Sequence, residues 1–188
     1  MSLKDKDKWN AKYESTAGLD ERGPSQWLAE HADLLAGKGK ALDIAMGEGR
    51  NALFAASLGY DVLGVDISEV GVSRAETLAR QNNLTIHTRI ADLDHYNIEE
   101  NSYDLILCFY FLNRRLFEGI RKGLKPGGIL IFKTFTVDYL KYSGFKREWV
   151  LEKNELREAF SELKILDYNE VDEPENEIAF ASLVARKE

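Results

Sequence analysis

The stretch that decides the fold is Lys40-Ala-Leu-Asp-Ile-Ala-Met-Gly-Glu-Gly-Arg-Asn-Ala-Leu-Phe54. Its first part is mostly apolar and contains Asp43, and its middle is rich in small residues. From Arg50 the apolar residues have helical spacing. That order is typical of a strand, a tight turn and the first turn of a helix. Gly47 and Gly49 let the backbone turn sharply and approach a ligand closely. The free N–H groups of the next helix add donors and partial positive charge, so the stretch predicts a site for a nucleotide-like molecule.

The spacing of the small residues argues against a dinucleotide. G-x-G-x-x-G would need glycine at 45, 47 and 50, but the chain has Ala45 and Arg50, and arginine cannot replace a glycine required for close helix packing. The Gly-Lys-Ser/Thr of a P-loop is also missing. D-x-A-x-G-x-G instead resembles motif I of the class I S-adenosylmethionine (AdoMet) methyltransferases, (D/E)-x-G-x-G-x-G. It is similar to the form in small bacterial enzymes related to tellurite-resistance and thiopurine methyltransferases. Alone, the loop could also be an ordinary glycine-rich turn.

Composition narrows the class of protein. The 188 residues are enough for one domain with a full core. The net charge of -7 opposes nucleic-acid binding, and no apolar run approaches the ~20 residues that span a bilayer. The charged N-terminus is not a secretory signal, and one cysteine gives no disulfide framework. These features favour a cytoplasmic enzyme that binds neither nucleic acid nor membrane; the oligomeric state is not indicated.

The rest of the chain repeats the order of strand and helix. Strands are expected at 40–45, 61–66, 84–90, 103–110 and 129–135, and helices at 50–58, 68–82 and 115–124. The run 84–90 alternates in polarity and belongs near a sheet edge, whereas 103–110 is apolar and belongs inside. A turn is expected at 125–128. This alternation predicts a parallel sheet with helices on both faces.

The two ends of the chain differ from this pattern. Residues 1–8 are expected to be frayed, and helices are expected around Trp9–Tyr13 and from Pro24 to Leu35. Near the C-terminus, Asn154 is expected to cap a helix over 155–160. Strands at 163–171 and 178–186 are then close enough in sequence to form an antiparallel hairpin.

Five alternating units followed by a hairpin resemble the class I methyltransferase fold. That fold is a Rossmann-like α/β sandwich with a seven-stranded, mostly parallel sheet, whose last, antiparallel strand lies between the fifth and sixth. The resemblance covers nearly the whole chain. It implies a single methyltransferase domain, 1–188, with an N-terminal lid or helical segment at 1–38 and an AdoMet-binding core at 39–188.

Three acids come at the ends of successive strands, where ligands bind in such sheets. By resemblance, Asp43 holds the amino-acid end of AdoMet, Asp66 the ribose hydroxyls and Asp92 the adenine amine, with the Leu93 backbone beside it. Trp9 and Tyr13 either pack together or close over the ligand as a lid. The full set expected at the cofactor is Trp9, Tyr13, Asp43, Ala45, Gly47, Glu48, Gly49, Arg50, Asp66, Ile67, Asp92, Leu93 and Phe109.

The acceptor is less well defined. The chain has Phe109-Tyr110-Phe111-Leu112 where DNA amino-methylases have (D/N)-P-P-(Y/F), and three scattered histidines suggest no metal site. Arg114 and Arg115 are either a solvated helix start or an anion clamp. We therefore expect a small acceptor, an oxyanion or a thiol such as tellurite, selenite or a thiopurine-like molecule. Residues expected to border its pocket are Arg114, Arg115, Tyr139, Lys141 and Tyr142.

Two other functions stay open. One is a nicotinamide-dependent oxidoreductase, which Arg50 disfavours. The other is a non-catalytic AdoMet-binding module, because methyl transfer from a sulfonium demands orientation more than a dedicated catalytic base.

Overall fold

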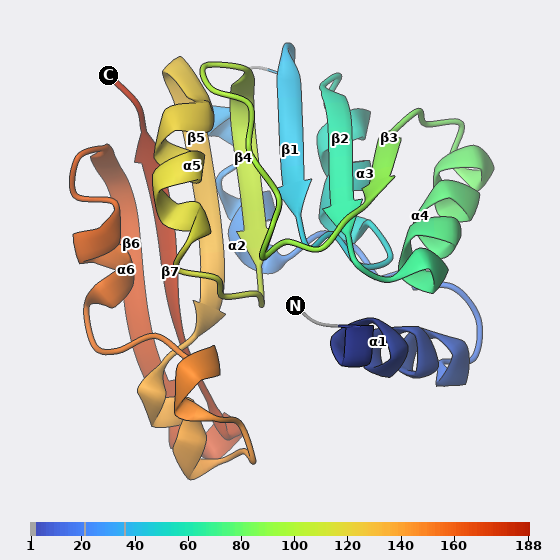
Figure 1. Ribbon diagram of the computed structural model, residues 1–188. Coiled ribbons are helices and arrows are strands. Elements are labelled where there is room, and N and C mark those ends of the chain that lie inside the picture. The colour runs from blue at the N-terminus through green and yellow to red at the C-terminus, as the bar shows by residue number, and fades with distance from the viewer. Residues whose placement is uncertain (1–2, 21, 36) are drawn as a thin grey trace.

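A seven-stranded sheet forms the centre of the computed structural model, which describes residues 3–20, 22–35 and 37–188 (Figure 1). The strands are β1 (Lys40–Ile44), β2 (Asp61–Asp66), β3 (His87–Ile90), β4 (Tyr103–Phe109), β5 (Leu124–Phe135), β6 (Lys164–Glu173) and β7 (Ile178–Arg186). Their order is β3-β2-β1-β4-β5-β7-β6. The first five strands are parallel and β7 is antiparallel to both neighbours. The order reverses between β1 and β4, and ligands bind at such a switch point, beyond the carboxyl ends of the strands.

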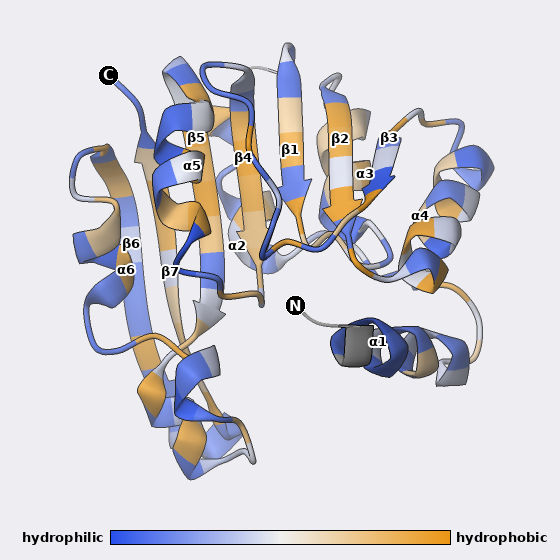
Figure 2. Cartoon of the chain, in the orientation of Figure 1, coloured by the Kyte–Doolittle hydropathy of each residue, from blue (hydrophilic) through white to orange (hydrophobic). Residues whose placement is uncertain are grey.

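Helices cover both faces of the sheet. On one face lie α5 (Leu116–Gly123) and α6 (Glu155–Ala159), which bury Phe117 and Phe160 against the strands. On the other lie α2 (Gln26–Glu30), α3 (Arg50–Ser57) and α4 (Glu69–Gln81). The central strands are apolar along most of their length because both of their faces are covered (Figure 2). The expected sandwich, sheet order and hairpin are therefore confirmed.

Two further parts lie beyond the carboxyl ends of the strands (Figure 1). One is α1 (Leu3–Ser15), below β2 and α4 in this view. The other, which we call the lobe, is residues 136–150, with two 3₁₀ helices, Val137–Lys141 and Arg147–Trp149. A further 3₁₀ turn, Pro174–Asn176, joins β6 to β7. None of the described helices has the length and apolar character needed to cross a membrane.

Several expected elements differ in the structure. Helix α1 begins at Leu3, so the described part of 1–8 is helical rather than frayed. The helix expected over 24–35 breaks at His31 into α2 and a 3₁₀ turn, Ala32–Leu34. The turn at 125–128 is a bulged start of β5. Asn154 precedes α6, but its φ is 63° and its side chain makes no capping hydrogen bond, so the expected cap is wrong.

Candidate functional site

The β1–α3 loop is a tight, buried turn held in a left-handed conformation. φ is 57° at Ala45, 56° at Gly47 and 81° at Gly49. A Cβ on Gly49 would lie 2.8 Å from the Cβ of Ala75 on α4, so only glycine lets that helix pack here. Ala45 adopts a left-handed φ with a side chain, at a cost of about 1–2 kcal/mol. The loop therefore tolerates the alanine where the family motif has glycine, at the expense of backbone strain.

Asp66, at the end of β2, ties the loop to the start of α4. One carboxylate oxygen accepts the Gly47 N–H at 2.8 Å and the other accepts the Ser68 N–H at 2.8 Å. Ser68 caps α4 as expected, since its Oγ accepts the Gly71 N–H at 3.0 Å. Burial raises the pKa of the Asp66 carboxyl, while the backbone donors oppose that rise. Each oxygen keeps a second lone pair, so the same group can also accept from a ligand hydroxyl.

Asp43, at the end of β1, is the least satisfied acid of the site. Its side chain is 2% exposed, and among the described residues its Oδ2 has no hydrogen-bond partner. Burial raises the pKa of this carboxyl to about 8, against the lowering effect of the Ala52 backbone N–H. A buried carboxylate oxygen without a partner is costly and fits a positively charged ligand group.

Helix α1 covers the loop. The Tyr13 ring fills a slot between two glycines: a Cβ on Gly47 would lie 2.5 Å from its Oη, and a Cβ on Gly71 3.0 Å from its Cε2. Asn10 accepts a hydrogen bond of 2.6 Å from the Ser68 hydroxyl. Burial, and next to it the charge of Asp66, raises the pKa of the Tyr13 phenol. Trp9 stacks on Tyr13 at 5.9 Å, so the ring that α1 places against the loop is backed by a second aromatic ring.

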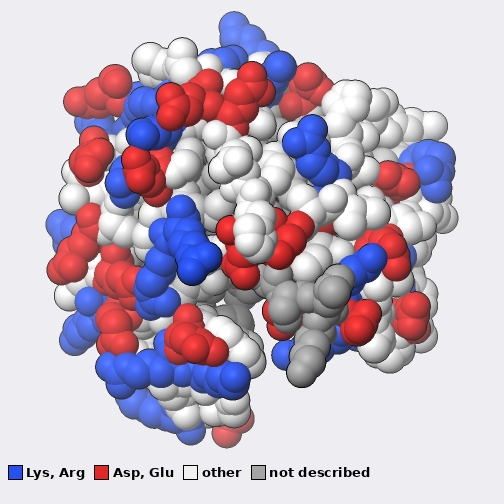
Figure 3. All heavy atoms as spheres, in the orientation of Figure 1, with Lys and Arg blue, Asp and Glu red and all other residues white. Residues whose placement is uncertain are grey.

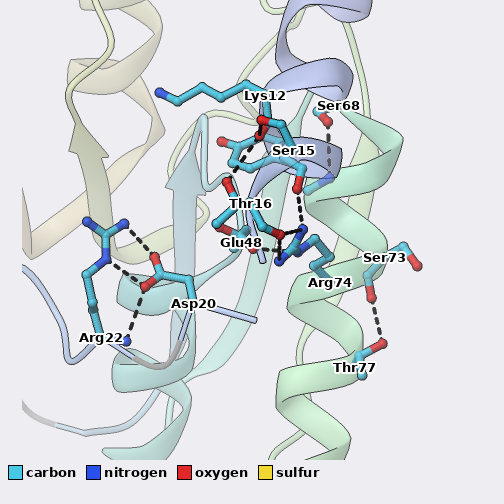
Figure 4. Close-up of polar contacts among 12 residues, drawn as sticks. Lys12, Ser15, Thr16, Asp20, Arg22, Glu48, Ser68, Ser73, Arg74 and Thr77 are labelled. Carbon is cyan, nitrogen blue, oxygen red and sulfur yellow. Dashed lines mark hydrogen bonds and ion pairs between the residues drawn. The ribbon is translucent and has the colours of Figure 1, made fainter. Parts of the chain in front are cut away.

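One arginine joins the loop, α4 and α1 (Figure 4). Arg74 Nε lies 2.6 Å from Glu48 Oε1, with side chains only 15% and 7% exposed. The same guanidinium donates to the backbone carbonyls of Tyr13 and Thr16, where α1 ends. Arg74 is not among the residues predicted from the sequence, because a lone arginine in a helix carries no signal for partners so far away in the chain.

The remaining cofactor candidates line the same edge of the sheet. Asp92 follows β3, and its two oxygens contact the Asp94 N–H at 2.9 Å and His95 Nδ1 at 3.1 Å. Leu93 is fully buried in the core, so only its backbone is available to a ligand. Three more candidates lie at the ends of β2 and β4 and at the start of α3: Ile67, Phe109 and Arg50.

The acceptor-side candidates separate into two groups. Arg114 holds the lobe: it makes a two-pronged ion pair with Glu155 at 2.5 and 2.7 Å and donates to the carbonyls of Glu148 and Val150. Lys141 and Tyr142 both bind the Asp172 carboxylate, at 2.6 and 2.7 Å. These three side chains are engaged in contacts within the protein, and their place at the border of an acceptor pocket stays a prediction. Arg115 and Tyr139 stay available.

Arg114→Ala is expected to lower the free energy of unfolding by about 1.5–3 kcal/mol, because it leaves Glu155 and two lobe carbonyls without their charged donor. Urea unfolding measures the loss. Arg115→Ala is the matched control; its guanidinium makes no ion pair with any described residue, so the change should stay within about 0.5 kcal/mol. A larger loss for Arg115→Ala than for Arg114→Ala would contradict this assignment.

Aromatic side chains line the region between β4 and the lobe. Ring centroids are 5.4 Å apart for Tyr110 and Phe135, 4.2 Å for Phe135 and Tyr139, 5.2 Å for Tyr139 and Phe145, and 6.0 Å for Phe145 and Trp149. We call these five residues the aromatic wall. Tyr110 is 42% exposed at a φ of 55°, and a bulky residue in that conformation is a strained exception. The surface is hollowed between the lobe and α1 (Figure 3).

Comparison with known proteins supports a single family. Residues 1–175 match the model of the tellurite resistance protein TehB family. A probable S-adenosyl-L-methionine-dependent methyltransferase TehB of Haemophilus influenzae is 34% identical over 165 residues, which are 79% of this chain and 57% of that protein. This chain thus spans little more than half the length of that relative.

Solved structures agree with the family match. The crystal structure of TehB from Haemophilus influenzae matches with a TM-score of 0.72 and 27% identity, covering 97% of this chain and 67% of that one. An S-adenosylmethionine-dependent methyltransferase from Mesorhizobium loti matches with a TM-score of 0.70 and, at 22% identity, supports the fold alone. It covers 90% of this chain and 100% of that one. The chain therefore belongs to the TehB family of class I methyltransferases.

Proposed function

We propose that this protein transfers a methyl group from AdoMet to a small-molecule acceptor. The observation that carries the proposal is the pair of buried acids, Asp43 and Asp66, on either side of a left-handed glycine loop at the switch point of the sheet. The unpartnered oxygen of Asp43 fits the ammonium of the methionine arm, and Asp66 fits the ribose hydroxyls. The TehB relatives are named for the same cofactor.

Methyl transfer from AdoMet requires orientation of the two reactants more than it requires a dedicated base. The acceptor's lone pair forms the new bond to carbon while the sulfonium C–S bond breaks, and that electron pair stays on sulfur. A thiol acceptor loses its proton to water. The protein holds the two partners in line, which can lower the barrier by up to about 7–11 kcal/mol.

The acceptor side favours a small, soft molecule. Tyr110 lies at the end of β4 beside the cofactor loop, and the guanidinium of Arg50 is 5.7 Å from its ring. Arg50 and Arg115 have no ion-pair partner among the described residues, so both are available to an anion. We propose that an oxyanion or a thiol binds next to Tyr110, at the end of the aromatic wall nearest to β4.

Two measurements test the proposal. Equilibrium binding of AdoMet and of NAD(H) separates a methyltransferase from an oxidoreductase; binding of NAD(H) alone would overturn the assignment. A screen with methyl-labelled AdoMet against thiols, tellurite, selenite and metabolite acids then separates an enzyme from a non-catalytic module. The expected result is AdoMet binding with turnover of at least one thiol or oxyanion.

Tyr110→Leu is expected to raise the KM of the best acceptor about tenfold, because one stacked ring contributes roughly 0.5–1.5 kcal/mol beyond its buried area. The Kd of AdoMet should stay unchanged. Phe54→Leu, on α3 and outside the wall, serves as a control and should leave both constants unchanged. Equal loss of acceptor and AdoMet binding would place Tyr110 at the cofactor instead.

A further inference from the structure

Among the described residues, Arg74 contacts both Glu48 of the cofactor loop and the backbone carbonyls at the end of α1. It extends from the middle of α4 and meets Glu48 of the loop through its Nε. Its two terminal nitrogens donate to the carbonyls of Tyr13 and Thr16, and Figure 4 shows Arg74 beside both Glu48 and Thr16. Carbonyls at a helix end have no partner within the helix, so a guanidinium there satisfies them and matches the helix dipole.

This contact is an ion pair by distance without the geometry of a hydrogen bond, and its burial makes either charge costly to leave alone. Arg74 and Glu48 are both largely shielded from water, and an ion pair at 2.6 Å in such a place is screened little by salt. Removal of one partner would leave the other charge buried and unpaired, which is more costly than loss of an exposed pair. Separating α1 from the loop therefore exposes two carbonyls and disturbs a buried charge.

Two other polar contacts of α1, among those of the described residues, tie it to α4. Lys6 and Glu69 form an ion pair at 3.1 Å whose side chains are 28% and 55% exposed. The bond between Ser68 and Asn10 anchors the middle of the helix to the N-terminal cap of α4. Neither contact reaches the β1–α3 loop. The seating of Tyr13 against Gly47 thus depends on the position of the end of α1, which Arg74 holds.

We propose that Arg74 is a positioning residue for cofactor binding, acting through Glu48 and the end of α1. It orders the lid and the loop together before AdoMet arrives. This inference rests on the proposed function. When only a fraction of the molecules has both parts in place, the apparent Kd equals the intrinsic Kd divided by that fraction. Loss of the guanidinium lowers the fraction and therefore weakens binding.

The test is the Kd of AdoMet, measured by calorimetry with the full chain. Arg74→Ala is expected to raise the Kd about tenfold or more, to raise the KM of AdoMet in parallel and to leave kcat at saturating AdoMet within twofold. Arg74→Lys keeps the charge beside Glu48 but cannot also reach two carbonyls, so an intermediate Kd is expected. Arg80→Ala is the control, because within the described part of the chain the Arg80 side chain hydrogen-bonds Thr77 of the same helix and reaches neither the loop nor α1.

A second readout follows the lid itself. Hydrogen exchange or limited proteolysis of residues 9–20 should report a released α1 in Arg74→Ala and an unchanged one in Arg80→Ala. Unaltered or tighter AdoMet binding by a folded Arg74→Ala would overturn the proposal. So would a weakened Kd with α1 still fully protected. If Arg74→Ala does not fold, the Kd of AdoMet and the protection of α1 are compared between Arg74→Lys and Arg80→Ala instead. Failure of the wild-type chain to bind AdoMet would instead reject the proposed function.

Discussion

Asp43→Asn is expected to be more stable than the wild-type protein at pH 8 and to lose most of the wild type's dependence of stability on pH. The Asp43 carboxyl has a pKa of about 8 in the folded protein because it is buried, against about 3.9 in an unfolded chain. The folded state therefore holds a proton that the unfolded state releases. The contribution of this carboxyl to stability is full below about pH 4 and is lost as pH rises to about 8, by up to about 1.4 kcal/mol per pH unit.

Urea unfolding at pH 5, 6, 7 and 8 measures this slope. The pKa of Asp66 is raised in the same direction, so a smaller slope should remain in Asp43→Asn. Asp104→Asn provides a contrasting control: Asp104 is ion-paired with Lys125 at 2.7 Å, and its loss should reduce stability at neutral pH. A wild-type stability that is flat from pH 5 to 8 would show that Asp43 is already ionised in the folded protein.

AdoMet should change this behaviour if its ammonium meets Asp43. A positive charge beside the carboxyl favours the ionised form. The stabilisation that AdoMet gives to the wild type should then be greater at pH 8 than at pH 6. In Asp43→Asn it should be smaller and should show none of the pH dependence that comes from this carboxyl. The comparison thus links the least satisfied group of the folded protein to the proposed cofactor.

The sheet and its acids were predictable because their signals are local. Strands β2 and β4 are continuous apolar runs, and Asp43 and Asp66 mark the points where such runs end. The N-terminal helix was not predictable in full. Its Lys/Asp start has no apolar face, and it is helical where Lys6 and Asn10 contact Glu69 and Ser68, about 60 residues away.

The roles of the arginines depended on distant partners. Arg114 follows β4 beside the site, which suggested an anion clamp, yet Glu155 lies 41 positions along the chain and takes its guanidinium. Arg74 pairs with Glu48, which lies 26 positions earlier in the chain, before α3 and β2. Helix periodicity places such residues on a face of a helix but says nothing of what that face meets. The sequence therefore predicts which strand ends carry acids better than it predicts which charges hold the loop and the helices together.

Gly47→Val is expected to lower AdoMet affinity at least a hundredfold. The substitution places a β-branched residue at a φ of 56° and puts a Cβ 2.5 Å from Tyr13 Oη. Backbone strain alone accounts for about 1–2 kcal/mol. The larger effect comes from the ejection of Tyr13 and from added bulk where the loop must approach the cofactor. Calorimetric titration with AdoMet measures the loss.

Two further glycines separate these causes. Gly127→Val carries the same kind of strain, at a φ of 81°, but no atom lies within 4 Å of the new Cβ, and the turn is remote from the site. It should reduce stability and leave AdoMet affinity unchanged.

Gly71→Ala adds no left-handed strain and would strengthen an isolated helix by about 1 kcal/mol. Here its Cβ would lie 3.0 Å from the Tyr13 ring and 3.2 Å from the Gly47 carbonyl. If Gly71→Ala weakens AdoMet binding while Gly127→Val does not, the slot that holds Tyr13 belongs to the cofactor site. If Gly47→Val and Gly71→Ala both bind AdoMet with normal affinity, the cofactor binds elsewhere.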